Sequence, residues 1–248
     1  MFMKQMLLRL LVPAVLLALI LILTSMVANS QLAAEAAEAI ALPPAPAAPR
    51  PSETVEVDPA MHAFFAYYLT QEWKLPVEDA CNLATWVLKY SSHYQTDPMV
   101  QLARVLKESR GRHYRSSKHR TPANVVRGGA REIGYSQIMP FWAGKQVQDI
   151  TISRDMLYDP EGNIRAGIAL YKRYESGANS YLLALARYNR PGSRRPTSYA
   201  RGVDRIYQDI KRKHEAFAAL QPSEYFKRVA VLAECWSVTP SGPSEVYF

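Results

Sequence analysis

The chain is poor in glycine, with 11 in 248 residues, and it contains only two cysteines and five histidines. Low glycine and abundant helix-forming residues predict a helical domain. The cysteine spacing fits no metal-binding motif, and no histidine lies at ligand spacing from a cysteine or an acidic residue. We therefore expect no metal and no other cofactor.

The two cysteines, Cys81 and Cys235, leave two states open. In an oxidising compartment they can pair and tie the C-terminal segment to the body of the domain. In the alternative state they are two buried apolar thiols. The sequence gives no distance between them, so it does not decide.

The formal net charge of the chain is +8. A basic chain suits a polyanionic partner such as nucleic acid, anionic lipid headgroups or an acidic polymer. Charge alone does not choose among these partners. A solvated basic surface without any partner is equally consistent with it.

Residues 1–30 have the pattern of an export segment. Lys4 and Arg9 precede an apolar run from Leu10 to Leu23, so the basic end should stay in the cytoplasm while the rest crosses the membrane. The run is short for a spanning helix and long for a cleaved signal, so a signal peptide and a signal anchor both stay open. No cysteine follows the run, which argues against a lipoprotein anchor.

Composition divides the rest of the chain into three parts. Residues 31–57 are rich in alanine and proline and predict an extended linker. Residues 58–220 have helical patterning and predict one compact domain with its own core. Residues 221–248 predict a C-terminal helix followed by a disordered tail.

Within residues 58–220, Asp-Pro pairs mark helix starts, because aspartate is a good N-cap and proline suits the first helical position. The pairs are Asp58-Pro59, Asp97-Pro98 and Asp159-Pro160. Apolar residues at helical spacing predict further helices over Val77–Tyr90, Tyr181–Tyr188 and 198–219. Only Val147–Ile152 has an extended pattern, so the sequence predicts an all-α domain.

Glu108 lies near the end of the helix that begins at Asp97-Pro98, nearly opposite its apolar stripe. The ordinary interpretation is an exposed glutamate paired with Arg104 one turn earlier. However, Glu108 is the only acidic residue in the strongly basic stretch 104–131. A single acidic residue in such a stretch is either an exposed residue without a function or part of a functional site.

Four motifs then occur in the order typical of one family. Leu102–Ser109 (LARVLKES) resembles a helix end of the form A-x-x-x-x-E-S, and Gly134–Pro140 (GYSQIMP) resembles G-L-M-Q-x-M-P. Asp159–Gly167 (DPEGNIRAG) and Ala184–Asn189 (ALARYN) are similar to D-P-x-x-N-I-x-x-G and A-L-A-x-Y-N. Each motif alone is weak. The ordered set resembles bacterial lytic transglycosylases of the soluble-lytic type, which are similar to goose-type lysozymes.

This resemblance implies a lysozyme-like helical fold and cleavage of the β-1,4 bond between N-acetylmuramic acid and N-acetylglucosamine, with formation of a 1,6-anhydromuramyl end. It implies Glu108 as the single catalytic acid/base. The positions implied in substrate binding are Ser109, Tyr135, Ser136, Gln137, Tyr188 and Asn189. Tyr188 is expected to orient the Glu108 carboxylate, and Gln137 to bond sugar groups.

The chain departs from the family pattern in three places. Tyr135-Ser136 replaces the usual Leu-Met and makes that wall more polar. The turn after Asn189 is the basic segment Arg190–Arg195, which suits acidic groups of the substrate or is simply solvated. The stretch 110–129 is long and basic, and is either a mobile flap over the cleft or a surface insertion.

A general acid must hold its proton near neutral pH, so burial of Glu108 must outweigh the nearby basic side chains. The implied partners are peptidoglycan glycan strands and, as a further option, cell-envelope machinery, but no nucleic acid. The implied location is periplasmic, secreted, or anchored in the inner membrane facing the periplasm.

Two alternative functions stay open. A hydrolytic, lysozyme-like muramidase would need a placed water and a second acid, for which Glu132 and Asp155 are the candidates by position. A non-enzymatic cell-wall-binding scaffold would tolerate the loss of Glu108.

Overall fold

The computed structural model describes residues 57–115, 120–129, 131–221, 223, 224, 228 and 230. The chain divides into two units, residues 1–44 and 45–248, and all described residues lie in the second. The predicted export segment, nearly all of the linker 31–57 and most of 221–248 lie outside the described residues. The predictions for these parts therefore stay predictions.

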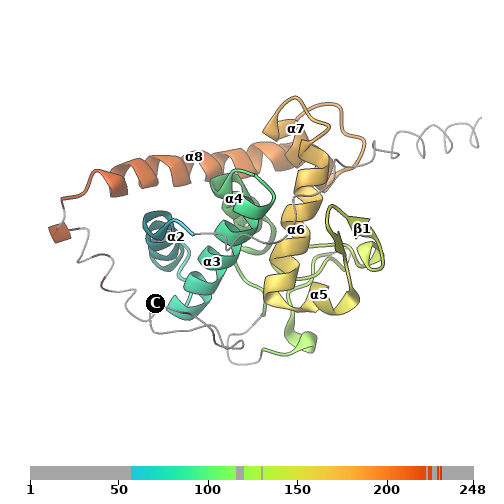
Figure 1. Cartoon of the computed structure of the whole chain (residues 1–248), viewed down its shortest axis with the longest axis horizontal. Helices are drawn as coiled ribbons and strands as arrows, with labels where there is room; N and C mark the ends of the chain where they lie inside the picture. The colour runs from blue at the N-terminus through green and yellow to red at the C-terminus, as the bar shows by residue number, and fades with distance from the viewer. Residues whose placement is uncertain are drawn as a thin grey trace, which may run out of the picture. The chain divides into compact units, whose positions relative to one another are not determined.

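The described residues form mainly helices (Figure 1). In chain order these are α2 (Pro59–Glu72), α3 (Val77–His93), α4 (Pro98–Ser109), α5 (Arg154–Tyr158), α6 (Pro160–Glu175), α7 (Tyr181–Asn189) and α8 (Ser198–Ala218). The short α5 was not predicted, but the all-α fold class is confirmed.

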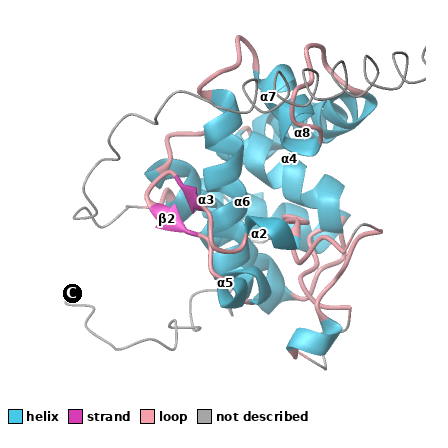
Figure 2. Ribbon diagram, turned by 90° about the vertical axis from the view of Figure 1, so that its right-hand side faces the viewer, coloured by secondary structure: helices cyan, strands magenta, loops and turns pink. Residues whose placement is uncertain are grey.

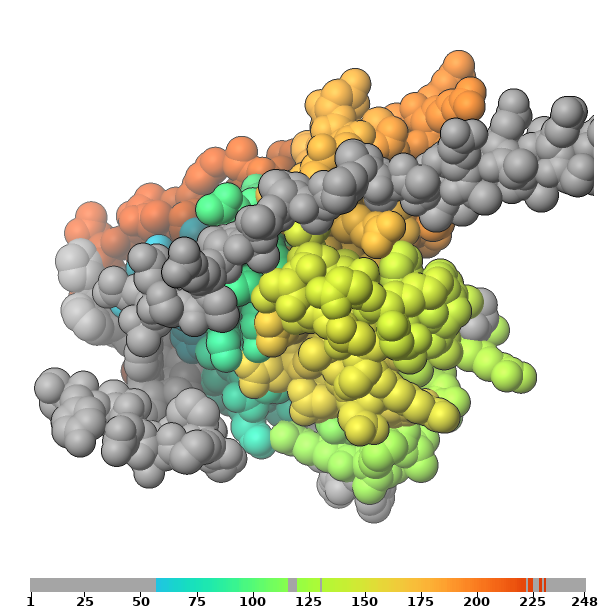
Figure 3. Space-filling model, turned by 45° about the vertical axis from the view of Figure 1, so that its right-hand side comes forward, coloured from blue at the N-terminus to red at the C-terminus, as the bar shows by residue number. Residues whose placement is uncertain are grey.

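A small irregular region lies between α4 and α5. It contains two turns of 3₁₀-helix, Pro122–Asn124 and Pro140–Trp142, and a two-stranded antiparallel hairpin of β1 (Gln146–Val147) and β2 (Ile150–Thr151). The hairpin overlaps Val147–Ile152, the segment that the sequence predicted as extended, and begins one residue before it (Figure 2). In Figure 3 the yellow-green atoms of this region gather into one lobe on the visible face.

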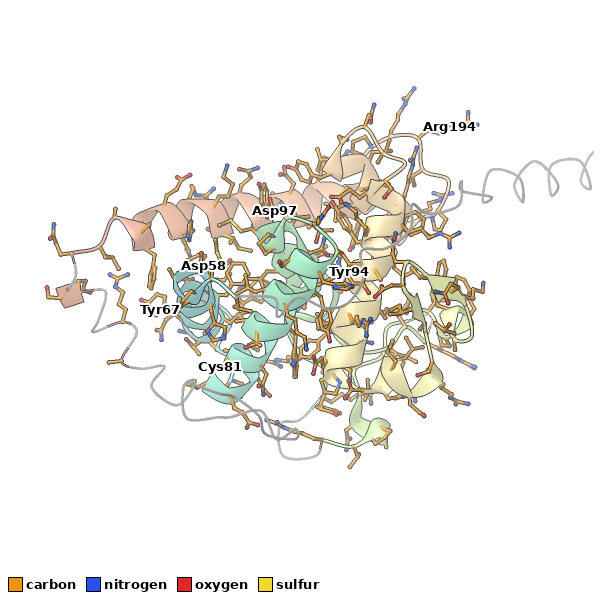
Figure 4. All side chains as sticks on the ribbon, in the orientation of Figure 1. Asp58, Tyr67, Cys81, Tyr94, Asp97 and Arg194 are labelled. Carbon is orange, nitrogen blue, oxygen red and sulfur yellow. The ribbon has the colours of Figure 1, made fainter. Side chains whose placement is uncertain are left out.

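All three Asp-Pro pairs begin helices, as predicted. Asp58, Asp97 and Asp159 each accept a hydrogen bond from a backbone N–H of the first helical turn, at 2.9, 2.8 and 2.6 Å. These N–H groups have no partner inside the helix, so the caps satisfy them. Asp97 thereby fixes the start of α4, the helix that carries Glu108 (Figure 4).

Helix α4 is surrounded by its neighbours. It packs along α8 and against α3, while α6 packs against α3, α5 and α7. The buried residues of α4 cover most of its circumference: Val100, Gln101, Leu102, Ala103, Arg104, Val105, Leu106 and Ser109. A helix buried on several sides is held rigidly, so α4 is a firm support for the residues at its end.

The chain turns sharply where α4 ends. Arg110 and Gly111 both have a left-handed backbone, with φ of 57° and 68°. A Cβ added at Gly111 would lie 3.0 Å from Leu75 and 3.2 Å from Leu106, so glycine meets both the backbone and the space requirement. This turn leaves Glu108 in the last turn of the helix.

The described parts of the basic stretch 110–129 are attached to the body. Tyr114 pairs with Val125 in an isolated bridge. Arg120 makes ion pairs with Glu78 and Asp79 of α3, both at 2.9 Å. These contacts favour a surface insertion over a mobile flap for the described part of the stretch.

Cys81 lies on α3, is 5% exposed and is disulfide-bonded rather than free. Its expected partner Cys235 lies outside the described residues, so the pairing stays a prediction. Among the described residues, no helix combines the length and apolar character needed to cross a membrane.

Candidate active site

Glu108 is partly buried in the last turn of α4, and the start of α8 lies against it. The Tyr199 hydroxyl donates a hydrogen bond of 2.5 Å to Glu108 Oε1. Burial raises the pKa of Glu108 from its ordinary 4.5 to about 7. The hydrogen bond from Tyr199 and the positive charges of Arg104 and Lys107 lower this pKa, and the charge of Glu132 raises it.

The prediction that burial outweighs the nearby basic side chains is therefore confirmed for Glu108. A carboxyl with a pKa of about 7 is present in both protonation states at neutral pH. It can give up a proton in one step and accept one in the next. This is the property required of a single acid/base residue.

The interpretation of Glu108 as an exposed partner of Arg104 is wrong, because Arg104 is completely buried and forms no ion pair with it. The Arg104 guanidinium donates from Nε to Gln101 at 3.0 Å and from Nη1 to the Tyr188 hydroxyl at 2.9 Å. It also lies over the Tyr188 ring, 4.7 Å from the centroid. Arg104 thus connects α4 to α7.

The Tyr188 hydroxyl makes no hydrogen bond to the Glu108 carboxylate, although the resemblance implied that Tyr188 orients it. Its hydroxyl donates to the backbone oxygen of Ser136 at 2.7 Å and accepts from Arg104. The hydroxyl that holds Glu108 belongs instead to Tyr199. Tyr188 ties α7 to the turn that contains Ser136 and Gln137.

Two of the predicted substrate-binding residues turn away from Glu108. The Ser109 hydroxyl is buried and donates to the Val105 carbonyl of its own helix at 3.1 Å. Tyr135 is also buried, and its ring packs against His113 and Trp86. Tyr135 borders a separate pocket of about 350 Å³ near the start of α3.

Ser136 is completely buried, and its backbone N–H donates to Asn163 at 2.8 Å. The next residue, Gln137, is partly exposed and has a positive φ of 45°. Its Nε2 donates to the Gly134 carbonyl at 2.7 Å, which leaves the amide oxygen Oε1 as an acceptor. Ser136 therefore supports the turn, and Gln137 is the residue that can reach a ligand.

Glu132 lies close to Gln137. A Cβ added at Gly128 would collide with both the Glu132 carboxylate and the Gln137 amide oxygen, so the two side chains lie over the same point of the backbone. Glu132 is also close enough to Glu108 for its charge to raise the pKa of Glu108. Asp155 is exposed on α5 and has no such effect among the causes of the Glu108 shift.

Asn189 is the last residue of α7 and is exposed. The basic segment that follows, Arg190–Arg195, is largely exposed as well. Figure 4 shows Arg194 extending away from the ribbon beyond α7. Asn189 and this segment can meet a ligand without rearrangement of the core.

Sequence reasoning missed two site residues, Tyr199 and Arg104. Tyr199 is 91 residues away from Glu108 in the chain, and an ordinary helical pattern surrounds it. The only sequence signal for Arg104 is its position among the apolar residues of a helix that is expected to be buried. Among the described residues, no three His, Cys, Asp or Glu side chains gather as a metal site.

Comparison with known proteins gives one finding. The family model described as the transglycosylase SLT domain matches residues 85–211, slightly more than half of the chain. The matched span includes Glu108, Gln137, Tyr188 and Tyr199. No curated protein and no solved structure matches the chain.

Proposed function

This chain belongs to the transglycosylase SLT domain family, and from that membership we propose that it is a lytic transglycosylase of peptidoglycan. Family membership gives it a transglycosylase-type action on peptidoglycan. In our proposal it cleaves the β-1,4 bond between N-acetylmuramic acid and N-acetylglucosamine and leaves a 1,6-anhydromuramyl end. The observation that carries the proposal is the pKa of Glu108, which burial raises to about 7.

In the first step Glu108 acts as the general acid. Its carboxyl proton passes to the glycosidic oxygen, the bond from that oxygen to muramyl C1 breaks, and N-acetylglucosamine leaves as a free hydroxyl. The N-acetyl group of the substrate stabilises the positive charge at C1, so no second carboxylate is needed. Burial supports this step because it keeps the proton on Glu108 near neutral pH.

In the second step the Glu108 carboxylate acts as the general base. It accepts the proton of the muramyl C6 hydroxyl while that oxygen bonds to C1 and closes the anhydro ring. Glu108 returns to its protonated form, and no water is consumed. The Tyr199 hydroxyl occupies Oε1, so Oε2 is the oxygen that exchanges the proton.

The residues around Glu108 divide into two groups in this proposal. Gln137 and Asn189 are exposed enough to bond sugar groups, while the buried Ser109 and Ser136 and the partly buried Tyr188 support the site. The exposed cations of Arg190–Arg195 suit the carboxylates of peptide stems. The Tyr135 ring packs against His113 and Trp86 instead.

Hydrolysis is the second candidate, because Glu132 lies near both Gln137 and Glu108. A second carboxylate there is able to activate a water molecule, which would then attack C1 in place of the C6 hydroxyl. The two reactions give different products, since a hydrolysed end is heavier by one water than an anhydro end.

Mass analysis of fragments from purified peptidoglycan tests the proposal. We expect anhydro ends from the wild-type chain and also from Glu132→Gln, and no fragments from Glu108→Gln. Ends that carry the extra water, and that disappear in Glu132→Gln, would instead identify a hydrolase. No fragments from the wild-type chain would favour a scaffold.

The location and partners are also proposals. The basic start and the apolar run in residues 1–30 support export, with the domain in the periplasm, secreted or anchored to the inner membrane. Export supports peptidoglycan over nucleic acid as the partner.

A further inference from the structure

Arg104 is completely buried, and no carboxylate lies within ion-pair distance of it among the described residues. An arginine side chain does not lose its proton in a protein, so a full positive charge lies inside the domain. A buried charge without a counter-ion is costly. Such an arrangement calls for a role beyond packing.

The contacts of Arg104 join three helices. Its Nε and Nη1 donate to Gln101 of α4 and to the Tyr188 hydroxyl of α7. Its Nη2 has no hydrogen-bond partner and faces α6, where a Cβ added at Gly167 would lie 3.0 Å away. The same Cβ would overlap the Ser136 side chain, so the guanidinium, Ser136 and Gly167 meet at one point.

This meeting point accounts for a departure from the family pattern. The family motif has methionine at the position of Ser136. A side chain larger than serine there would compete with the Arg104 guanidinium for the space over Gly167. Arg104 and Ser136 therefore fit each other as a pair.

A chain of hydrogen bonds leads from Arg104 to the ligand-facing turn. Arg104 holds the Tyr188 hydroxyl, and that hydroxyl donates to the backbone oxygen of Ser136 at 2.7 Å. Gln137 is the next residue. Arg104 is thus connected through two hydrogen bonds to the backbone of the residue before Gln137.

Arg104 also acts on Glu108 through its charge. It lies one helical turn before Glu108, and its charge favours the ionised carboxylate. The other groups that face Glu108 are Lys107 on α4, Tyr199 on α8, Tyr188 on α7 and Glu132 in the irregular region after α4. Lys107 is exposed to solvent, which screens its charge, whereas Arg104 is not.

We propose that Arg104 is a positioning residue for the reaction: its guanidinium fixes Tyr188 and the turn before Gln137, and its buried charge stabilises Glu108 as the carboxylate that accepts the C6 hydroxyl proton. This inference rests on the proposed function and deepens it. Without Arg104, burial would hold the Glu108 proton more tightly, so Glu108 would transfer that proton to the glycosidic oxygen less readily in the first step.

The test compares Arg104→Met, which keeps the length and removes the charge, with Arg104→Lys, which keeps the charge. The rate of anhydro-product release is measured against pH in the full chain. The rate should fall at high pH as Glu108 loses its proton. In Arg104→Met the midpoint of this decline should shift to a higher pH by about one unit or more, and the maximal rate should be lower. In Arg104→Lys the midpoint should stay at the wild-type pH.

A second readout does not depend on activity. Carbon NMR of the Glu108 side-chain carboxyl gives its titration midpoint without substrate, and this midpoint should show the same shift. An inactive wild-type chain would count against the proposed function, while the NMR shift would still report on Arg104. Tyr188→Phe serves as a matched control, because it breaks the hydrogen bonds and keeps the charge. Its rate should be lower with the pH of the fall unchanged.

A folded Arg104→Met chain with the wild-type titration midpoint would overturn the proposal. If Arg104→Met does not fold, Arg104→Gln carries the same test, since it keeps a donor for Tyr188. Unfolding of both neutral variants beside a folded Arg104→Lys would also overturn the proposal, because Arg104 would then serve the fold alone.

Discussion

Replacing Glu108 with glutamine is expected to stabilise the domain above neutral pH. Burial raises the pKa of Glu108 from 4.5 to about 7. At about 1.4 kcal/mol per pKa unit, the ionised carboxylate costs the folded state about 3 kcal/mol. Below pH 4.5 both folded and unfolded chains hold the proton, and there is no cost. Between pH 4.5 and 7 the unfolded chain loses the proton while the folded chain keeps it, so the cost grows with pH. Above pH 7 both are ionised, and the cost is complete.

Glutamine removes this cost because it does not ionise. Its amide oxygen still accepts the hydrogen bond from Tyr199, so the packing at the end of α4 is kept. The variant should therefore resemble the wild type at pH 4.5 and exceed it progressively towards pH 8, by an amount on the order of 3 kcal/mol.

Urea unfolding at a series of pH values measures the difference. Glu215→Gln is the matched control, because Glu215 is exposed on α8 and forms no ion pair in the described residues. This control should show no pH-dependent gain. A constant difference between wild type and Glu108→Gln from pH 4.5 to 8 would refute the reasoning, since it would mean that Glu108 ionises normally.

Three further predictions follow from the structure and the sequence. Tyr199→Phe removes the hydrogen-bond donor to the Glu108 carboxylate, so the decline in reaction rate at high pH should begin at a higher pH than in the wild type. A decline at the wild-type pH would contradict the hydrogen bond between Tyr199 and Glu108. If Cys81 and Cys235 pair, non-reducing mass analysis should find no free thiols and the double serine variant should lose about 2–4 kcal/mol in denaturant unfolding, whereas two alkylated thiols would exclude the bond. A reporter fused after residue 60 should be active only outside the cytoplasm, and cytoplasmic activity would contradict export.

Local signals predicted the helices well because they depend on neighbouring residues. Asp97-Pro98 places a capping oxygen and a fixed φ next to each other, and α4 begins there. The motif containing Glu108 was also local, so the candidate acid was found from the sequence. The raised pKa of Glu108 was expected as well, because a general acid must hold its proton near neutral pH.

Contacts between distant segments were not predictable in the same way. Tyr199 donates to Glu108 from 91 residues away, and no pattern around Tyr199 indicates that α8 begins beside α4. The helical angle placed Glu108 opposite the apolar stripe, but α8 covers that face as well. For Tyr188 the motif predicted a place near Glu108 but not the partners of its hydroxyl, which are the buried Arg104 and the backbone oxygen of Ser136.

The central claim is that Glu108 is the acid and base of a non-hydrolytic cleavage of peptidoglycan. The most direct measurement is the rate at which 1,6-anhydromuramyl ends appear from purified peptidoglycan, with wild-type and Glu108→Gln chains compared at equal helical circular dichroism. The variant should lose activity by about 10²–10⁴-fold, towards the upper end because no second carboxylate takes part. Anhydro ends released by a folded Glu108→Gln chain at a near wild-type rate would contradict the account.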